Sequence, residues 1–86
     1  MRRESEYFGE TELDLVYMAR RLGDALSLEA LLNAAAVDYL VETGTYTTGF
    51  FLKRDLTGAF FYVAPKDLKV TRELLIQNRL KPYDPE

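Results

Sequence analysis

The stretch Gly58-Ala59-Phe60-Phe61-Tyr62-Val63 places three aromatic residues in succession between small and β-branched neighbours. Runs of aromatic and β-branched residues are typical of strands. Neighbouring side chains of a strand point to opposite faces of the sheet, so the three rings cannot all share one face. The sequence therefore predicts a strand over 59–63 with apolar side chains on both faces, and each face needs a cover.

Two further strands are predicted earlier in the chain. Residues 13–19 are mostly apolar and rich in strand formers. Residues 37–43 alternate, with Tyr39 on one side and Asp38 and Glu42 on the other. This alternation indicates a strand that is buried on one face only.

Two helices are predicted, one on either side of the later two strands. Residues 25–36 are dominated by alanine and leucine, and their apolar positions form one helical stripe: Ala25, Leu28, Leu32 and Ala35. Asp24 is the expected N-cap of this helix, with Ser27 as the competing cap. A second helix is expected from Pro65 to about residue 80, where Lys81-Pro82 ends it.

The element order β-α-β-β-α predicts an α+β, ferredoxin-like split βαβ fold. The first two strands run parallel through a right-handed crossover, and the third lies antiparallel between them. Both helices then cover the same face of the sheet, which makes a two-layer sandwich. We expect one domain over 13–80, an N-terminal arm over 1–12 and a tail over 81–86, with the usual fourth strand missing or rudimentary.

Residues 44–58 form a long connection between the second and third strands. The connection is too long for a tight hairpin, although it can contain a short ribbon of its own. If it contacts a partner, the candidate residues are Tyr46, Phe50 and Arg54.

The sheet face away from the helices is predicted to carry an apolar patch. The expected interface residues are Val16, Met18, Leu40, Phe60 and Tyr62. An apolar patch of a few hundred Å² is usually either covered by another part of the protein or used as a binding surface. At ~25 cal/mol per Å², covering about 300 Å² contributes roughly 7 kcal/mol before the costs of association.

Three kinds of cover remain open for this patch. The arm 1–12 or the connection 44–58 can fold back over the sheet. A second copy can pack face to face or pair through the edge of the first strand. A ligand or a foreign protein is the third alternative.

Composition excludes several kinds of chemistry. The chain of 86 residues has 11 basic and 14 acidic residues, a net charge of −3, and neither cysteine nor histidine. Zinc sites built on those residues and Cys-His or Ser-His nucleophiles are therefore excluded. We expect no catalysis, no cofactor and no metal.

The same composition bears on location. The charged start and the lack of any long apolar run argue against a signal peptide and a membrane span. With no disulfide possible, a cytoplasmic protein is the expectation.

Nucleic-acid binding is disfavoured, although RNA-recognition domains share the predicted topology. Such domains carry a basic residue and stacking aromatics around a glycine in the third strand. Here Thr57 precedes Gly58 and Ala59 follows it. The acidic net charge also gives little attraction for phosphates.

Four segments carry a resemblance to a known family: 16–19, 25–36, 37–41 and 58–67. Together they resemble small prokaryotic putative signal-transducing proteins that are related in fold to the nitrogen regulator PII. The resemblance implies a ferredoxin-like fold and regulatory binding, without catalytic residues to carry over. In PII-type regulators a partner-contacting loop joins strands two and three, where this chain has 44–58. Ala36 departs from the glycine common before the second strand.

These observations predict a small non-catalytic binding or regulatory module. We expect it to form a homodimer or higher homo-oligomer through the open sheet face or edge. The alternative is a monomeric domain that binds a small ligand or a protein through the 44–58 connection and the open face.

Overall fold

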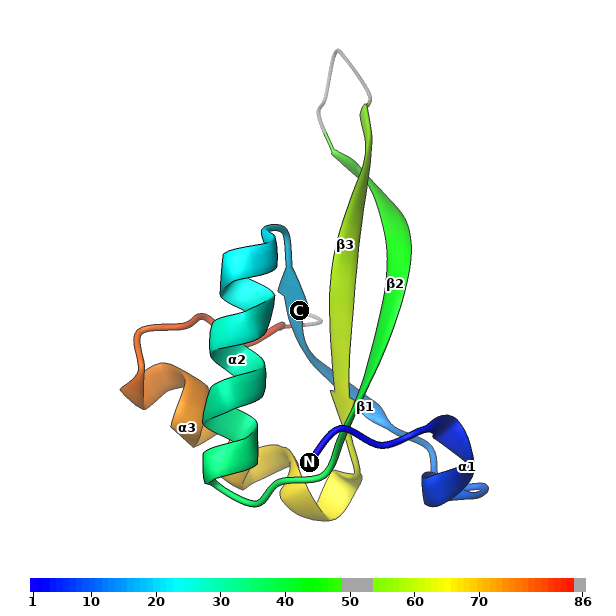
Figure 1. Cartoon of the computed structure of the whole chain (residues 1–86), viewed down its shortest axis with the longest axis vertical. Coiled ribbons are helices and arrows are strands. Elements are labelled where there is room, and N and C mark those ends of the chain that lie inside the picture. Colours follow the sequence, from blue (N-terminus) through cyan, green and yellow to red (C-terminus); the bar gives the residue numbers. More distant parts are fainter. Residues whose placement is uncertain (49–53, 85–86) are drawn as a thin grey trace.

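The structure is a computed structural model that describes residues 1–48 and 54–84. It is an α+β fold with a three-stranded antiparallel sheet (Figure 1). The elements in chain order are α1 (Ser5–Phe8), β1 (Asp14–Ala19), α2 (Leu22–Ala34), β2 (Tyr39–Thr48), β3 (Arg54–Val63), the 3₁₀ turn η1 (Pro65–Asp67) and α3 (Leu68–Gln77).

The strand order confirms the predicted arrangement of the sheet. β3 lies in the centre and pairs antiparallel with β1 on one side and β2 on the other. β1 and β2 are therefore parallel to each other and are joined through α2. Helices α2 and α3 lie on one face of the sheet, whereas α1 lies on the other (Figure 1). The expectation that helices occupy one face only is wrong for this short N-terminal helix.

The core forms between α2, α3 and one face of the sheet. Phe61 and Val63 of β3 and Tyr39 of β2 are fully buried there. Leu28 and Leu32 of α2 meet them from the helical layer. The alternation along 59–63 thus assigns Phe61 and Val63 to the core and leaves Phe60 and Tyr62 on the other face.

Helix α2 begins earlier than predicted. Its N-cap position is Arg21, and Asp24 lies in the first turn instead of capping the helix. Leu22 is 76% exposed, so the added turn buries little and the apolar stripe does not reveal it. Asp24 still favours the helix start, since an acidic side chain in the first turn complements the positive end of the helix dipole.

Helix α3 packs on the core through Leu75, with Leu74 partly buried beside it. The buried positions of α3 are Thr71 and Leu75. Val70 and Ile76 are apolar but are 58% and 61% exposed. The helix therefore turns a narrower apolar stripe to the sheet than its sequence indicates.

Strands β2 and β3 are both longer than predicted, with 10 residues each. Their pairing continues from Tyr39↔Val63 to Thr48↔Arg54, whereas β1 reaches only as far as Ala59. Most of the 44–58 connection is thus a continuation of the two strands, which projects beyond β1 as a two-stranded ribbon (Figure 1).

The N-terminal residues are docked against β2. The amide of Arg3 donates to the carbonyl of Tyr39, and the Tyr39 amide donates to the carbonyl of Met1. Arg2 forms an isolated parallel bridge with Tyr39. Phe8 is buried, whereas Tyr7 is 56% exposed.

Candidate interaction surface

The open face of the sheet carries two rows of side chains that cross all three strands. The strand register places Leu15, Tyr62 and Leu40 in one row. The next row contains Met18, Phe60 and Glu42. We call the five apolar members of these rows the open-face patch: Leu15, Met18, Leu40, Phe60 and Tyr62.

Every residue of the open-face patch is partly exposed. Cross-strand neighbours shield part of each side chain, but α2 and α3 lie on the other side of the sheet (Figure 1). α1 lies on the same side as the patch at one end. A hollow of about 220 Å³ there is lined by Phe8, Asp38 and Ala64. The arm therefore covers the end of the face and leaves the two rows accessible.

Val16 was expected on the open face, and that placement is wrong. Its side chain is fully buried in the core. The pairing of β1 with β3 shifts between Leu15 and Tyr17, which marks a β-bulge at Val16. A bulge adds one residue to one strand and so changes which face the following side chains occupy. Leu15, which is not among the five predicted residues, takes the patch position opposite Tyr62.

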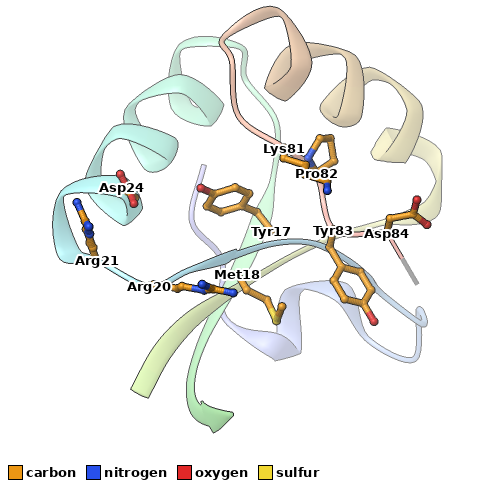
Figure 2. Close-up of a pocket in the computed structure, with 9 residues that line it drawn as sticks. All are labelled: Tyr17, Met18, Arg20, Arg21, Asp24, Lys81, Pro82, Tyr83 and Asp84. Atoms are coloured by element: carbon orange, nitrogen blue, oxygen red, sulfur yellow. The ribbon is translucent and has the colours of Figure 1, made fainter. Parts of the chain in front are cut away.

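The other four predicted patch residues lie together as expected. Met18 is opposite Phe60, and Leu40 is opposite Tyr62. Figure 2 shows Met18 on the face of β1 away from Tyr17, which points toward the helical layer. The alternation of side chains between the two faces predicted the positions on β2 and β3 correctly, because neither strand has a bulge in the described pairing.

Phe60 extends the patch toward the ribbon. A Cβ built on Gly44 would lie 2.7 Å from Cε2 of the Phe60 ring. The ring therefore lies directly against the backbone of Gly44, diagonally across from its own partner Glu42. A side chain at this position would have to displace the Phe60 ring.

The charged residue in these two rows is Glu42, an acidic side chain at the edge of the open-face patch. Burial raises the pKa of Tyr62, and the Glu42 carboxylate raises it further. Tyr62 is thus neutral at physiological pH, and Glu42 is exposed at the rim of the patch. An apolar centre with a charged rim is the ordinary anatomy of a protein–protein interface.

A second set of contacts fixes the arm beside the patch. The Asp38 carboxylate accepts hydrogen bonds from Arg3 Nε at 2.9 Å and from the Tyr7 hydroxyl at 3.0 Å. The hydrogen bond from Arg3 is the main reason that the pKa of Asp38 is lowered. Arg3 also lies over the Tyr7 ring at 4.4 Å, a cation–π contact.

The loop contact candidates lie outside what the structure describes. Phe50 falls outside the described residues. The backbones of Tyr46 and Arg54 belong to the ribbon, where they pair with Leu56 and Thr48, but their side chains are not described. Their proposed contacts stay predictions.

A groove follows the outer edge of β1 (Figure 2). It has a volume of about 720 Å³ and lies between the end of β1, the start of α2 and the C-terminal segment. Its lining residues are Tyr17, Met18, Arg20, Arg21, Asp24, Lys81, Pro82, Tyr83 and Asp84. The sequence reasoning did not identify this groove, since no motif connects residues so far apart in the chain.

Metal and membrane sites can be assessed for the described ranges. Within residues 1–48 and 54–84, no three carboxylates gather as metal ligands. None of the helices in the part of the chain that the structure describes is both long and apolar enough to cross a membrane.

Comparison with known proteins gave no match among protein-family models, curated proteins or solved structures.

Proposed function

We propose that this protein is a small non-catalytic binding or regulatory module with a ferredoxin-like fold, which self-associates through the open-face patch. The observation that carries the proposal is the pair of apolar rows on the sheet face opposite α2 and α3. The parallel β1 and β2 around a central β3 support the ferredoxin-like assignment.

The chemistry of the patch favours a second copy as its cover. Phe60 and Tyr62 lie on the central strand β3, and Met18 lies beside Phe60 on β1. Aromatic residues and methionine are enriched at protein interfaces. The patch can pack against the same patch of a second copy, because its centre is apolar and the acidic Glu42 lies at one side. A face-to-face dimer places apolar rows against each other and leaves both Glu42 side chains at the rim. The regulatory role and the cytoplasmic location are part of the same proposal.

The test is the molar mass in solution, measured by multi-angle light scattering. The wild-type chain is expected to be a dimer or higher oligomer, and Phe60→Glu or Tyr62→Glu is expected to be monomeric. A carboxylate at either position would lose its hydration on association without gaining a partner. Leu26→Glu on α2 is the control, since Leu26 is 56% exposed and lies outside the patch.

A monomeric wild-type chain would contradict self-association. So would an oligomer that is unaffected by Phe60→Glu and Tyr62→Glu while the circular dichroism of both variants remains native. A variant that loses its fold is replaced by Met18→Lys, which changes the same row from β1.

One observation favours a second candidate function. The ribbon of β2 and β3 projects beyond β1 (Figure 1). A projecting ribbon of this kind can reach a partner protein. In this alternative the domain is monomeric and uses the ribbon together with the open face. A monomeric wild-type chain in the light-scattering experiment would favour it.

A further inference from the structure

The C-terminal segment 81–84 lies along the outer edge of β1. In the part of the chain that the structure describes, β1 is the terminal strand of the sheet and no other strand pairs with its outer edge. The backbone amide of Tyr83 donates to the carbonyl of Val16 at 2.7 Å. The acceptor is the bulged residue of β1, so the bulge presents an outward carbonyl to the segment.

Two further contacts hold the segment in place. Nη1 of Arg72 on α3 donates to the carbonyl of Tyr83 at 2.8 Å. Pro82 is buried, although Lys81 and Asp84 on either side of this stretch are exposed. The backbone amide and the carbonyl of Tyr83 are thus both hydrogen-bonded, and the ring of Pro82 before it is buried. These are contacts that an extended peptide of another chain can make equally well.

The segment fills the edge incompletely. Residues 81–84 form no regular strand. Tyr83 and Asp84 line the 720 Å³ groove and also a second hollow of about 460 Å³ beside Leu15 and Arg72. In Figure 2 the Tyr83 ring points to the same side of β1 as Met18, away from Tyr17. A tightly packed fourth strand would close both hollows.

The charges around the edge fit an acidic occupant. The residues of the two hollows outside the segment include three arginines, Arg20, Arg21 and Arg72, and two aspartates, Asp14 and Asp24. The local balance is positive in a chain whose net charge is −3. The resident segment carries Asp84 directly after the anchored Tyr83.

We propose that the outer edge of β1 is a peptide-docking edge, which residues 81–84 occupy in cis and which an extended Pro-aromatic-acidic segment of a partner protein occupies in trans. Strand-edge recognition uses backbone hydrogen bonds for affinity and side-chain pockets for specificity. Here the Val16 carbonyl and Arg72 supply the backbone contacts. The buried site of Pro82 and the two hollows supply the pockets. Met18 and Leu15 line the hollows and also belong to the open-face patch. The contacts that carry the proposal, at the Val16 carbonyl, Arg72 and Pro82, lie outside that patch, so the proposal does not depend on self-association.

The experiment uses the full chain and a fluorescent, end-blocked peptide of residues 80–84, Leu-Lys-Pro-Tyr-Asp. Binding is measured by fluorescence anisotropy. Pro82→Gly removes the buried ring and loosens the segment, and it leaves unchanged the groove residues that β1 and α2 contribute. Because a cis occupant reduces the competent fraction, Pro82→Gly is expected to bind the peptide about tenfold more tightly than the wild type. Adding Arg72→Ala to Pro82→Gly is expected to weaken binding again.

A matched peptide decides whether the backbone contact is responsible. Methylation of the tyrosine amide removes the donor to Val16 and is expected to abolish binding. Equal affinity of the wild type and Pro82→Gly, or of the methylated and unmodified peptides, would overturn the proposal. Phe60→Glu is expected to bind the peptide as the wild type does, which separates this result from the test of the open-face patch.

A second measurement does not rely on the stability of Pro82→Gly. In the wild-type chain, hydrogen exchange of the Tyr83 amide is followed by nuclear magnetic resonance. Excess peptide is expected to speed this exchange, because displacement of the segment exposes the amide. Unchanged exchange at a large excess of peptide would contradict the proposal.

Discussion

Ala36 has a backbone φ of 58°, in the left-handed region that favours glycine. It follows the end of α2, where the Val37 amide donates to the carbonyl of Leu32 and the Ala36 amide donates to that of Asn33. This pattern is the Schellman motif, in which glycine is the usual residue at the position of Ala36. Arg79, with φ of 62°, has the same role after α3. Both helices therefore end with a residue that is strained for lack of glycine.

Replacing Ala36 by glycine is expected to stabilise the protein. The left-handed conformation costs an L-residue about 1–2 kcal/mol, and the added chain entropy of glycine offsets about 0.5–1 kcal/mol of that gain. The free energy of unfolding should rise by about 1 kcal/mol in urea denaturation. Ala35→Gly is the matched control, since Ala35 has a φ of −86° and should lose stability. Equal destabilisation by the two substitutions would refute this account of the helix end.

At the scale of elements, Tyr39 joins β2 to α2. Its ring is fully buried, and its hydroxyl donates to Oε1 of Glu29 on α2 at 3.0 Å. Arg2 lies 3.7 Å from the same carboxylate oxygen, so the docked N-terminal residues complete the contact. Burial, followed by the hydrogen bond to Glu29, raises the pKa of Tyr39 from 10.0 to about 12. The neutral hydroxyl is thus the form that the folded state favours.

This raised pKa predicts a loss of stability in alkali. The stabilising contribution is fully present below pH 10, where the unfolded tyrosine is still protonated, and it is lost as the pH rises from 10 to about 12. The free energy of unfolding of the wild type should fall across this window. In Tyr39→Phe the fall should be smaller, and at pH 7 this variant should lose about 1 kcal/mol for the missing hydrogen bond. Denaturation at a series of pH values measures both effects, and identical alkaline slopes for the two proteins would contradict the prediction.

At the scale of the whole molecule, the projecting ribbon makes the protein elongated (Figure 1). The radius of gyration is 13.2 Å, compared with about 12 Å for a compact domain of this length. The longest extent is 40 Å, against 25 Å for the shortest. A chain this small buries only about 60% of its unfolded surface, so burial by association has a large effect on its stability.

Self-association should make the thermal midpoint depend on protein concentration. For a dimer that unfolds to monomers, a tenfold increase in concentration should raise the midpoint by about 4 °C. Differential scanning fluorimetry over a range of concentrations measures this shift. Leu26→Glu should show the same slope as the wild type, while Phe60→Glu should show none. A midpoint independent of concentration in the wild type would argue against a folded dimer.

The sequence predicted the parts of the fold that depend on local pattern. The alternation of Phe60, Phe61 and Tyr62 correctly divided β3 between two faces, and the stripe of Leu28 and Leu32 identified the buried side of α2. The order of elements was enough to place β3 between β1 and β2, because short connections and crossover handedness leave few topologies. Four of the five predicted patch residues followed from these rules.

What the sequence by itself determined was therefore the α+β class and the apolar character of both sheet faces, which depend on neighbours within a few residues, and the strand order, which follows from the order of the elements and the crossover rule. Only the tertiary structure decided the bulge at Val16, the length of the ribbon and the position of Tyr83 beside β1. A bulge is selected by the fit of two paired strands, and no residue type requires it at Val16. The contacts of Tyr83 with Val16 and Arg72 arise only once α3 has brought the end of the chain back to the sheet.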